Sequence, residues 1–98
     1  MNKRTKYTNI SGKVKTRVFL RDGCCCIFCR SSRAYPEAHY ISRARGGLGI
    51  EQNVVTLCRE CHRRLDQSSE RDELLARVKE YLDTLYPDFT DEQRVYRG

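Results

Sequence analysis

Residues 54–62, VVTLCRECH, place an apolar, β-branched run directly before a C-x-x-C pair that is followed by a histidine. β-branched residues favour a strand over residues 54–57, and we expect a helix from Glu60 to about Asp66. A second C-x-x-C pair, CIFC at residues 26–29, is separated from the first by 28 residues. Two residues between thiolates let both sulfurs of a tight turn reach one ion. The two pairs therefore predict a small domain built around a metal centre.

Two such turns complete a closed tetrahedral sulfur site, which predicts a structural zinc ion because no coordination position is left for substrate. Cys24 and Cys25 leave the register of the first pair open, since Cys25-x-x-x-Cys29 is an alternative spacing. Disulfides are a further alternative, but no secretory signal precedes the cysteines, and a reducing cytosol disfavours them. The predicted zinc ligands are Cys26, Cys29, Cys58 and Cys61.

The same residues, Cys58-x-x-Cys61-His62, also match the attachment pattern of c-type haem. That alternative requires an export route, an apolar haem pocket and usually a second axial ligand. The only methionine in the chain is Met1. A purified protein without a Soret band would exclude haem.

The charge of the chain is unevenly distributed. The 98 residues include 19 Lys and Arg against 13 Asp and Glu, for a net charge of +6. Residues 1–21 carry seven basic residues and no acidic one, whereas residues 66–98 carry nine acidic and five basic residues. A positive front suits a protein that binds a phosphate backbone, and a solvated surface is the alternative interpretation. No run approaches the roughly 18 apolar residues of a membrane span, so we expect no membrane partner.

A chain of this length has a small hydrophobic core and usually needs an additional stabilising element, such as a bound metal ion. We predict an α+β domain in three parts: a basic flexible arm over residues 1–10, a zinc-braced domain over residues 11–68, and an amphipathic helix with a tail over residues 69–98. The last part packs on, or extends, the same domain. These features argue against a transmembrane protein, a secreted disulfide scaffold and a large multi-domain enzyme.

Local sequence patterns predict two further helices, a strand and a loop. A helix begins at Ser11 or Gly12 and ends at Gly23, a short strand covers residues 38–42, and a glycine-rich loop covers residues 43–52. Residues 69–72, SERD, resemble a capping box that opens the last helix, which Pro87 ends. Its apolar stripe predicts core or partner packing and consists of Leu74, Leu75, Val78, Tyr81, Leu82 and Leu85.

The chain has only two histidines, His39 and His62. His62 and Asp66 are four residues apart on the expected helix, so both side chains project from one face. An imidazole and a carboxylate on one face suit a divalent metal that keeps open positions for water and phosphate. A plain interaction between the two side chains is the alternative.

Residues 38–47 (AHYISRARGG) and 53–62 (NVVTLCRECH) resemble an HNH endonuclease. More narrowly, they are similar to the small zinc-containing HNH proteins common in bacteriophages and prophages of Gram-positive bacteria. The resemblance includes residues 21–23, RDG, and covers about residues 14–66. Residues 86–89, YPDF, resemble the tail of those relatives. The implied fold is ββα-metal, a β-hairpin and a helix that clasp one catalytic metal, here braced by zinc and flanked by N- and C-terminal helices.

The resemblance implies a metal-dependent DNA endonuclease. His39 would be the general base, since an imidazole with a pKa near 6.5 accepts a proton from water at neutral pH. His62 would hold the catalytic divalent metal, either Mg²⁺, Mn²⁺ or Ni²⁺. Asn53 would brace the glycine loop through backbone hydrogen bonds and so orient His39. The implied products carry 5′-phosphate and 3′-hydroxyl ends.

One position departs from the family pattern. Many HNH enzymes place an acidic residue or a histidine that ligates the metal directly before the base, and this chain has Ala38 there. A shifted alignment with Tyr40 as the base disagrees with the spacing to Asn53. We therefore expect Asp66 to be the second metal ligand, with Glu37 a weaker candidate. The departure leaves an inactive homologue as an alternative.

Guanidinium groups bind phosphate in a bidentate manner. The candidate DNA-binding residues flank the glycine loop or lie beside the metal helix, and they are Arg43, Arg45, Arg63 and Arg64. By family analogy, the partners are DNA and phage packaging proteins such as a terminase or portal, and the location is the cytoplasm of a bacterial host. Two other functions remain open: a non-catalytic zinc-ribbon DNA-binding module, and a zinc-braced adaptor that uses the apolar stripe.

Overall fold

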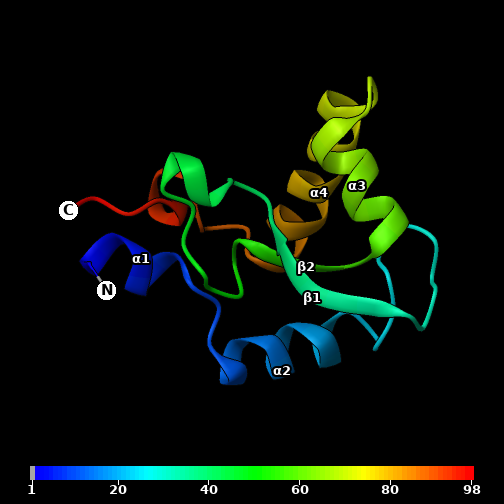
Figure 1. Ribbon diagram of the computed structural model, residues 1–98, viewed down its shortest axis with the longest axis horizontal. Coiled ribbons are helices and arrows are strands. Elements are labelled where there is room, and N and C mark those ends of the chain that lie inside the picture. Colours follow the sequence, from blue (N-terminus) through cyan, green and yellow to red (C-terminus); the bar gives the residue numbers. More distant parts are fainter. Residues whose placement is uncertain (1) are drawn as a thin grey trace.

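A two-stranded antiparallel sheet lies between helices in the computed structural model, which describes residues 2–98. Its strands are β1 (Ala34–His39) and β2 (Val54–Cys58). Helix α2 (Gly12–Arg21) lies on one side of the sheet, and α3 (Arg59–Gln67) and α4 (Arg71–Leu85) lie on the other (Figure 1). This arrangement confirms the predicted α+β class and explains why every residue of β2 is buried.

Strand β1 lies earlier in the chain than the predicted strand over residues 38–42. Its pairing with β2 is irregular between Tyr35 and Ala38, where Pro36 has no N–H to donate. The pairing of β1 with β2 ends after His39 because the Asn53 side chain binds the main chain of Ile41. Its amide oxygen accepts from the N–H of Ile41 at 2.9 Å, and its amide nitrogen donates to the carbonyl of Ile41 at 3.1 Å. Hydrogen bonds from a side chain thus replace the next backbone hydrogen bonds between the strands.

Helix α2 begins and ends as predicted. The Ser11 hydroxyl accepts a hydrogen bond from the N–H of Val14 at 3.2 Å, which satisfies one of the unpaired donors at the helix start. Gly23 follows the helix with a φ of +78°, a left-handed conformation that favours glycine. The fully buried Val18 fixes the face of α2 that packs on the sheet.

The start of α4 differs from the predicted capping box. The Ser68 hydroxyl accepts a hydrogen bond from the N–H of Glu70 at 3.1 Å and donates one to the carbonyl of Arg64 at 2.7 Å. Glu70 precedes α4 and forms no side-chain cap. Ser68 therefore shapes a tight turn that ends α3 and leads directly into α4.

The apolar stripe of α4 packs into the core, as one of the two predicted alternatives states. Leu74, Val78 and Leu82 are buried, whereas Leu85 at the end of the helix is 41% exposed. The same cluster includes three of the predicted zinc ligands, so the core and the metal centre are continuous. Its buried members are Cys26, Ala34, Ala38, Val55, Leu57, Cys58, Cys61, Leu65, Leu74, Val78 and Leu82.

Where the sequence predicts a flexible arm over residues 1–10, residues 3–8 form a short helix; Met1 lies outside the described residues. Helix α1 (Lys3–Thr8) packs on the glycine loop: the carbonyl of Tyr7 accepts a hydrogen bond from the N–H of Gly49 at 3.0 Å. The Tyr7 ring also stacks on that of Tyr96, with centroids 5.6 Å apart. These partners are distant in sequence, so local composition gave no sign of them.

The C-terminal tail packs on the same loop. A short 3₁₀ turn, η2 (Asp91–Arg94), buries the Arg94 side chain completely. The Arg94 guanidinium donates to the carbonyl of Gln52 at 2.7 Å and to the carboxylate of Asp91 at 2.6 Å. The main-chain carbonyl of Arg94 accepts a hydrogen bond from the N–H of Leu48 at 2.8 Å. The predicted loop contains one further 3₁₀ turn, η1 (Arg43–Arg45). Both ends of the chain therefore hold the loop that follows His39.

No helix among residues 2–98 combines the length and the apolar character needed to cross a membrane.

Candidate functional site

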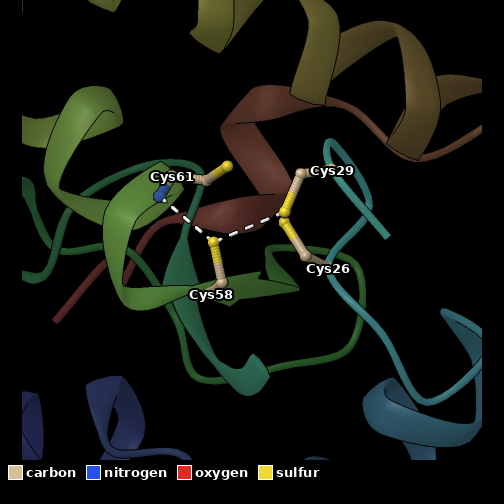
Figure 2. Close-up of side chains that lie close together, drawn as sticks. All are labelled: Cys26, Cys29, Cys58 and Cys61. Carbon is tan, nitrogen blue, oxygen red and sulfur yellow. Dashed lines mark hydrogen bonds between the residues drawn. The ribbon is translucent and has the colours of Figure 1, made fainter. Parts of the chain in front are cut away.

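Four cysteines from two parts of the chain converge at one end of the sheet. Cys26 and Cys29 lie in the turn that precedes β1, Cys58 ends β2, and Cys61 lies in the first turn of α3 (Figure 2). All four Sγ atoms lie within 4.8 Å of one another. The structure thus brings together the four predicted zinc ligands and no others from the cysteine run.

The spacing of the sulfurs fits a tetrahedral zinc ion. Sulfurs about 2.3 Å from a common zinc lie about 3.8 Å apart, and the Sγ atoms of Cys29 and Cys58 are 3.6 Å apart. The N–H of Cys61 donates to the Sγ of Cys58 at 3.3 Å (Figure 2), which links the first turn of α3 to the end of β2. The four cysteines could therefore hold a structural zinc ion.

The thiols of this centre have shifted proton affinities. Burial raises the pKa of Cys61, and hydrogen bonds with the neighbouring thiols raise it further. Burial also acts to raise the pKa of Cys26, but backbone hydrogen bonds at Cys29, Cys58 and Phe28 outweigh it and lower the pKa to about 7. Metal binding requires thiolates, so zinc would displace the protons of thiols whose pKa is raised, among them Cys61 and Cys29.

The neighbouring cysteines lie outside the centre, which decides the register that the sequence left open. Cys25 donates its thiol hydrogen to the carbonyl of Asp22 at 3.6 Å, and Cys24 is exposed. Cys58 and Cys61 both face the other pair of cysteines, an arrangement that serves one metal ion. The four-cysteine interpretation is therefore favoured over the pattern for attached haem.

His39 lies at the end of β1, where it lines an open groove of about 370 Å³. Its Nε2 lies 3.0 Å from the main-chain carbonyl oxygen of Thr8. The groove also contains Lys15 and Arg43, two cationic side chains. Glu37 lies in the same groove and pairs with Lys15, so Arg43 is the cation left beside the imidazole that could meet an anionic group.

The pKa of His39 is lowered below its usual value. Burial is the main cause, and electrostatic repulsion from Arg43 and His62 acts in the same direction. The hydrogen bond with the Thr8 carbonyl acts in the opposite direction. The lowered pKa favours the neutral form of His39 at neutral pH, and that His39 and His62 act in one site stays a prediction.

His62 and Asp66 form the predicted pair on one face of α3. The imidazole Nε2 of His62 lies 3.4 Å from a carboxylate oxygen of Asp66, and the two side chains are 31% and 59% exposed. An imidazole and a carboxylate could serve as part of a ligand set for a divalent cation, and a catalytic metal at this pair stays a prediction. Among residues 2–98, the four-cysteine centre is the one cluster of three or more metal-ligating side chains, so these two would hold a second metal alone.

The two residues directly before His39, Glu37 and Ala38, offer no unpaired carboxylate that could bind a metal. Ala38 is fully buried in the core, so its side of β1 faces away from the groove. Glu37 lines the groove but pairs with Lys15 at 3.5 Å and with Arg59 at 3.8 Å. Asp66 is therefore the carboxylate best placed to assist His62.

Asn53 makes the loop-bracing hydrogen bonds that the sequence predicts. It is fully buried, and besides its two bonds to Ile41 its amide donates to the carbonyl of Leu48 at 2.9 Å. Separately from the side chain, the main-chain carbonyl oxygen of Asn53 accepts a hydrogen bond from the N–H of Tyr40 at 2.8 Å. One side chain thus closes the loop between His39 and β2; its effect on catalysis stays a prediction.

The four candidate arginines separate into different surroundings. Arg43 faces the His39 groove and donates to the side chain of Asn9, whereas Arg45 lines a separate groove between the loop and α4. Arg63 pairs with Glu60 and Arg64 pairs with Glu70, the latter at 2.6 Å. Of the four, only Arg43 shares a groove with His39.

The basic residues of positions 1–21 also lie in different surroundings, some buried and others exposed. Arg21 is mostly buried and donates to the carbonyls of Glu51 at 2.6 Å and Val54 at 2.8 Å, so it supports the fold. Three lysines of α1 and α2 are exposed and make no ion pair within the described part of the chain; they are Lys3, Lys6 and Lys13. These lysines and Arg43 leave positive charge on the N-terminal side of the molecule.

Sequence reasoning missed the part that Thr8 plays, because a main-chain carbonyl carries no residue-type signal. Asp22 entered the sequence analysis only as part of the RDG motif at residues 21–23.

Comparison with protein-family models, curated proteins and solved structures gives no match to this chain.

Proposed function

We propose that this protein is a metal-dependent DNA endonuclease of the HNH type. One observation supports it above all: β1 ends in an imidazole that burial keeps neutral and that lines an open groove with Arg43, while α3 carries an imidazole–carboxylate pair. The order of these parts, a strand with the base, a loop, a second strand and a helix with metal ligands, is that of the ββα-metal motif.

His39 would act as the general base. Its imidazole accepts a proton from water, and the resulting hydroxide attacks the scissile phosphorus as the bond to the 3′ oxygen breaks. The lowered pKa of His39 keeps its acceptor nitrogen unprotonated at neutral pH, which base catalysis requires. The products would carry 5′-phosphate and 3′-hydroxyl ends, with the leaving oxygen protonated by solvent.

His62 and Asp66 would hold the divalent cation. When bound, such an ion supplies positive charge that stabilises the phosphate and the departing oxygen in the transition state. Arg43 lies in the His39 groove and would bind a phosphate oxygen of the same strand. The structural zinc would keep β2 and α3 in their relative positions, because Cys58 and Cys61 belong to these two elements.

Ala38 favours a second candidate, a zinc-braced DNA-binding module without catalysis. Its side chain lies in the core, so the metal site lacks the ligand that many HNH enzymes place before the base. Such a module would keep the cysteine centre and the exposed lysines but would not need His39.

Cleavage of supercoiled plasmid separates the two candidates. The zinc-loaded protein is incubated with plasmid and Mg²⁺, Mn²⁺ or Ni²⁺, and nicked and linear products are resolved on a gel. We expect wild type to produce nicked or linear DNA and His39→Ala to lose most of this activity. Gln67→Ala, an exposed change on α3, serves as the control. Equal cleavage by wild type and His39→Ala would exclude His39 as the base, and DNA binding without cleavage would support the second candidate.

A further inference from the structure

The contact between His39 and Thr8 decides which imidazole nitrogen carries a proton. A carbonyl oxygen has no hydrogen to donate, so the bond of 3.0 Å requires that Nε2 be the donor. In a neutral imidazole the other nitrogen, Nδ1, is then the acceptor. The contact therefore leaves Nδ1 as the atom that can take a proton from water.

Several contacts hold the Thr8 carbonyl in its place. The Arg4 guanidinium donates to the carbonyl of Ala44 at 2.6 Å, in the loop that follows β1. On the other side of Thr8, Asn9 accepts a hydrogen bond from Arg43. Thr8 itself is 3% exposed. Helix α1 is thus docked on the loop at both of its ends, which fixes the carbonyl relative to the imidazole.

Gly49 makes this docking sterically feasible. A Cβ at Gly49 would lie 2.1 Å from the carbonyl oxygen of Asn9 and 2.9 Å from the nitrogen of Ile10. Non-bonded atoms do not approach so closely, so a side chain at this position would push the N-terminal segment off the loop. The absent side chain of Gly49 and the position of Thr8 are therefore linked.

We propose that residues 3–9 are a positioning element for His39, in which the Thr8 carbonyl holds the imidazole as the Nε2–H tautomer with Nδ1 as proton acceptor. This assignment of a catalytic purpose rests on the proposed function of His39 as the base. Thr8 is a positioning residue: it touches the base and orients it, and it does not touch substrate.

The experiment compares Gly49→Ala with Gly12→Ala, a matched change at a glycine where a Cβ meets nothing within 4 Å. In ¹⁵N-labelled zinc-loaded protein, we expect wild type and Gly12→Ala to show an imidazole Nε2–H proton resonance for His39, protected from solvent exchange. Gly49→Ala should lose this resonance. On a short DNA duplex, Gly49→Ala should lower kcat by about 10²-fold, the scale of a misplaced catalytic group, with KM little changed.

A second variant, Arg4→Met, covers the case in which Gly49→Ala fails to fold. It removes the hydrogen bond to Ala44 from an exposed side chain and should weaken the same resonance without loss of zinc. An Nδ1–H signal in wild type, or a protected Nε2–H signal that survives in both Gly49→Ala and Arg4→Met, would overturn the positioning role. If the resonance behaves as expected but wild type cuts no DNA, the contact stands and the proposed endonuclease function fails.

Discussion

The carboxylate of Asp22 accepts a hydrogen bond from the main-chain N–H of Thr56 at 2.8 Å, which joins the end of α2 to the middle of β2. The same buried carboxylate accepts one from the Tyr81 hydroxyl of α4 at 2.5 Å and pairs with the Arg21 guanidinium at 2.8 Å. One acidic side chain thus connects both helical layers through the sheet between them.

Asp22→Ala should reduce the free energy of unfolding by about 3–5 kcal/mol, because loss of one partner leaves a buried charge unpaired. Urea unfolding followed by circular dichroism measures the change. The control is Glu60→Ala, which removes a pair with Arg63 in which both side chains are more than 60% exposed; exposed pairs contribute at most about 1 kcal/mol. Similar losses in both variants would contradict the bridging role of Asp22.

Cys58→Ser should unfold the domain. A structural zinc site contributes about 10–16 kcal/mol of apparent binding free energy to folding, and Cys58 is one of its four converging thiols. Metal analysis should give one zinc per chain in wild type and much less in the variant, with a lost thermal transition. Cys24→Ser, an exposed change outside the centre, should keep both zinc and fold. Loss of zinc from Cys24→Ser alone would show that the ligand set is wrong.

The lowered pKa of His39 predicts a pH dependence of stability. The unfolded chain takes up a proton near pH 6.5, whereas the folded chain does so only at a lower pH. The unfolded state therefore binds more protons between these two values, and the free energy of unfolding falls as the pH drops below about 6.5. Above pH 6.5 this contribution is constant.

An NMR titration of the His39 ring proton in zinc-loaded protein without added divalent metal measures this pKa directly. We expect a midpoint below 6.5, and His39→Gln should remove the part of the stability change that falls between that midpoint and 6.5. A midpoint above 6.5 would mean that the Thr8 carbonyl outweighs burial and the neighbouring positive charges.

Asp66→Asn should weaken binding of Mn²⁺ at His62 by about 10-fold or more, because a neutral amide is a poorer ligand for a hard cation than a carboxylate. Paramagnetic broadening of the His62 ring resonances by added Mn²⁺ reports occupancy at this position. Glu60→Gln changes a carboxylate on the same helix that pairs with Arg63 and should leave the broadening unchanged. If Glu60→Gln has the larger effect, Asp66 is not the second ligand.

Arg43→Ala and Arg45→Ala should differ in DNA affinity, because only Arg43 shares a groove with His39. Loss of one phosphate contact reduces the slope of log K against log salt by about 1. Fluorescence anisotropy of a labelled duplex, at several salt concentrations, measures the slope for each variant. We expect the reduction for Arg43→Ala and a near wild-type slope for Arg45→Ala; the reverse order would place DNA on the α4 side of the loop.

The sequence by itself determined the features that depend on near neighbours. The two C-x-x-C pairs predicted the metal centre, because a spacing of two residues brings sulfurs together within one turn. Ser11 and Gly23 predicted the bounds of α2, and the four-residue spacing of His62 and Asp66 predicted that they share a face. Asn53 was identified by the family resemblance, and its loop-bracing bonds are present.

Only the tertiary structure decided which of three consecutive cysteines joins the centre, where β1 ends, and which arginine faces His39. It also replaced a flexible arm by a docked helix whose Thr8 carbonyl contacts an imidazole 31 positions later in the chain. These outcomes depend on main-chain groups and on contacts between distant segments. Every residue carries the same carbonyl, so residue type cannot mark the one that packing brings to His39.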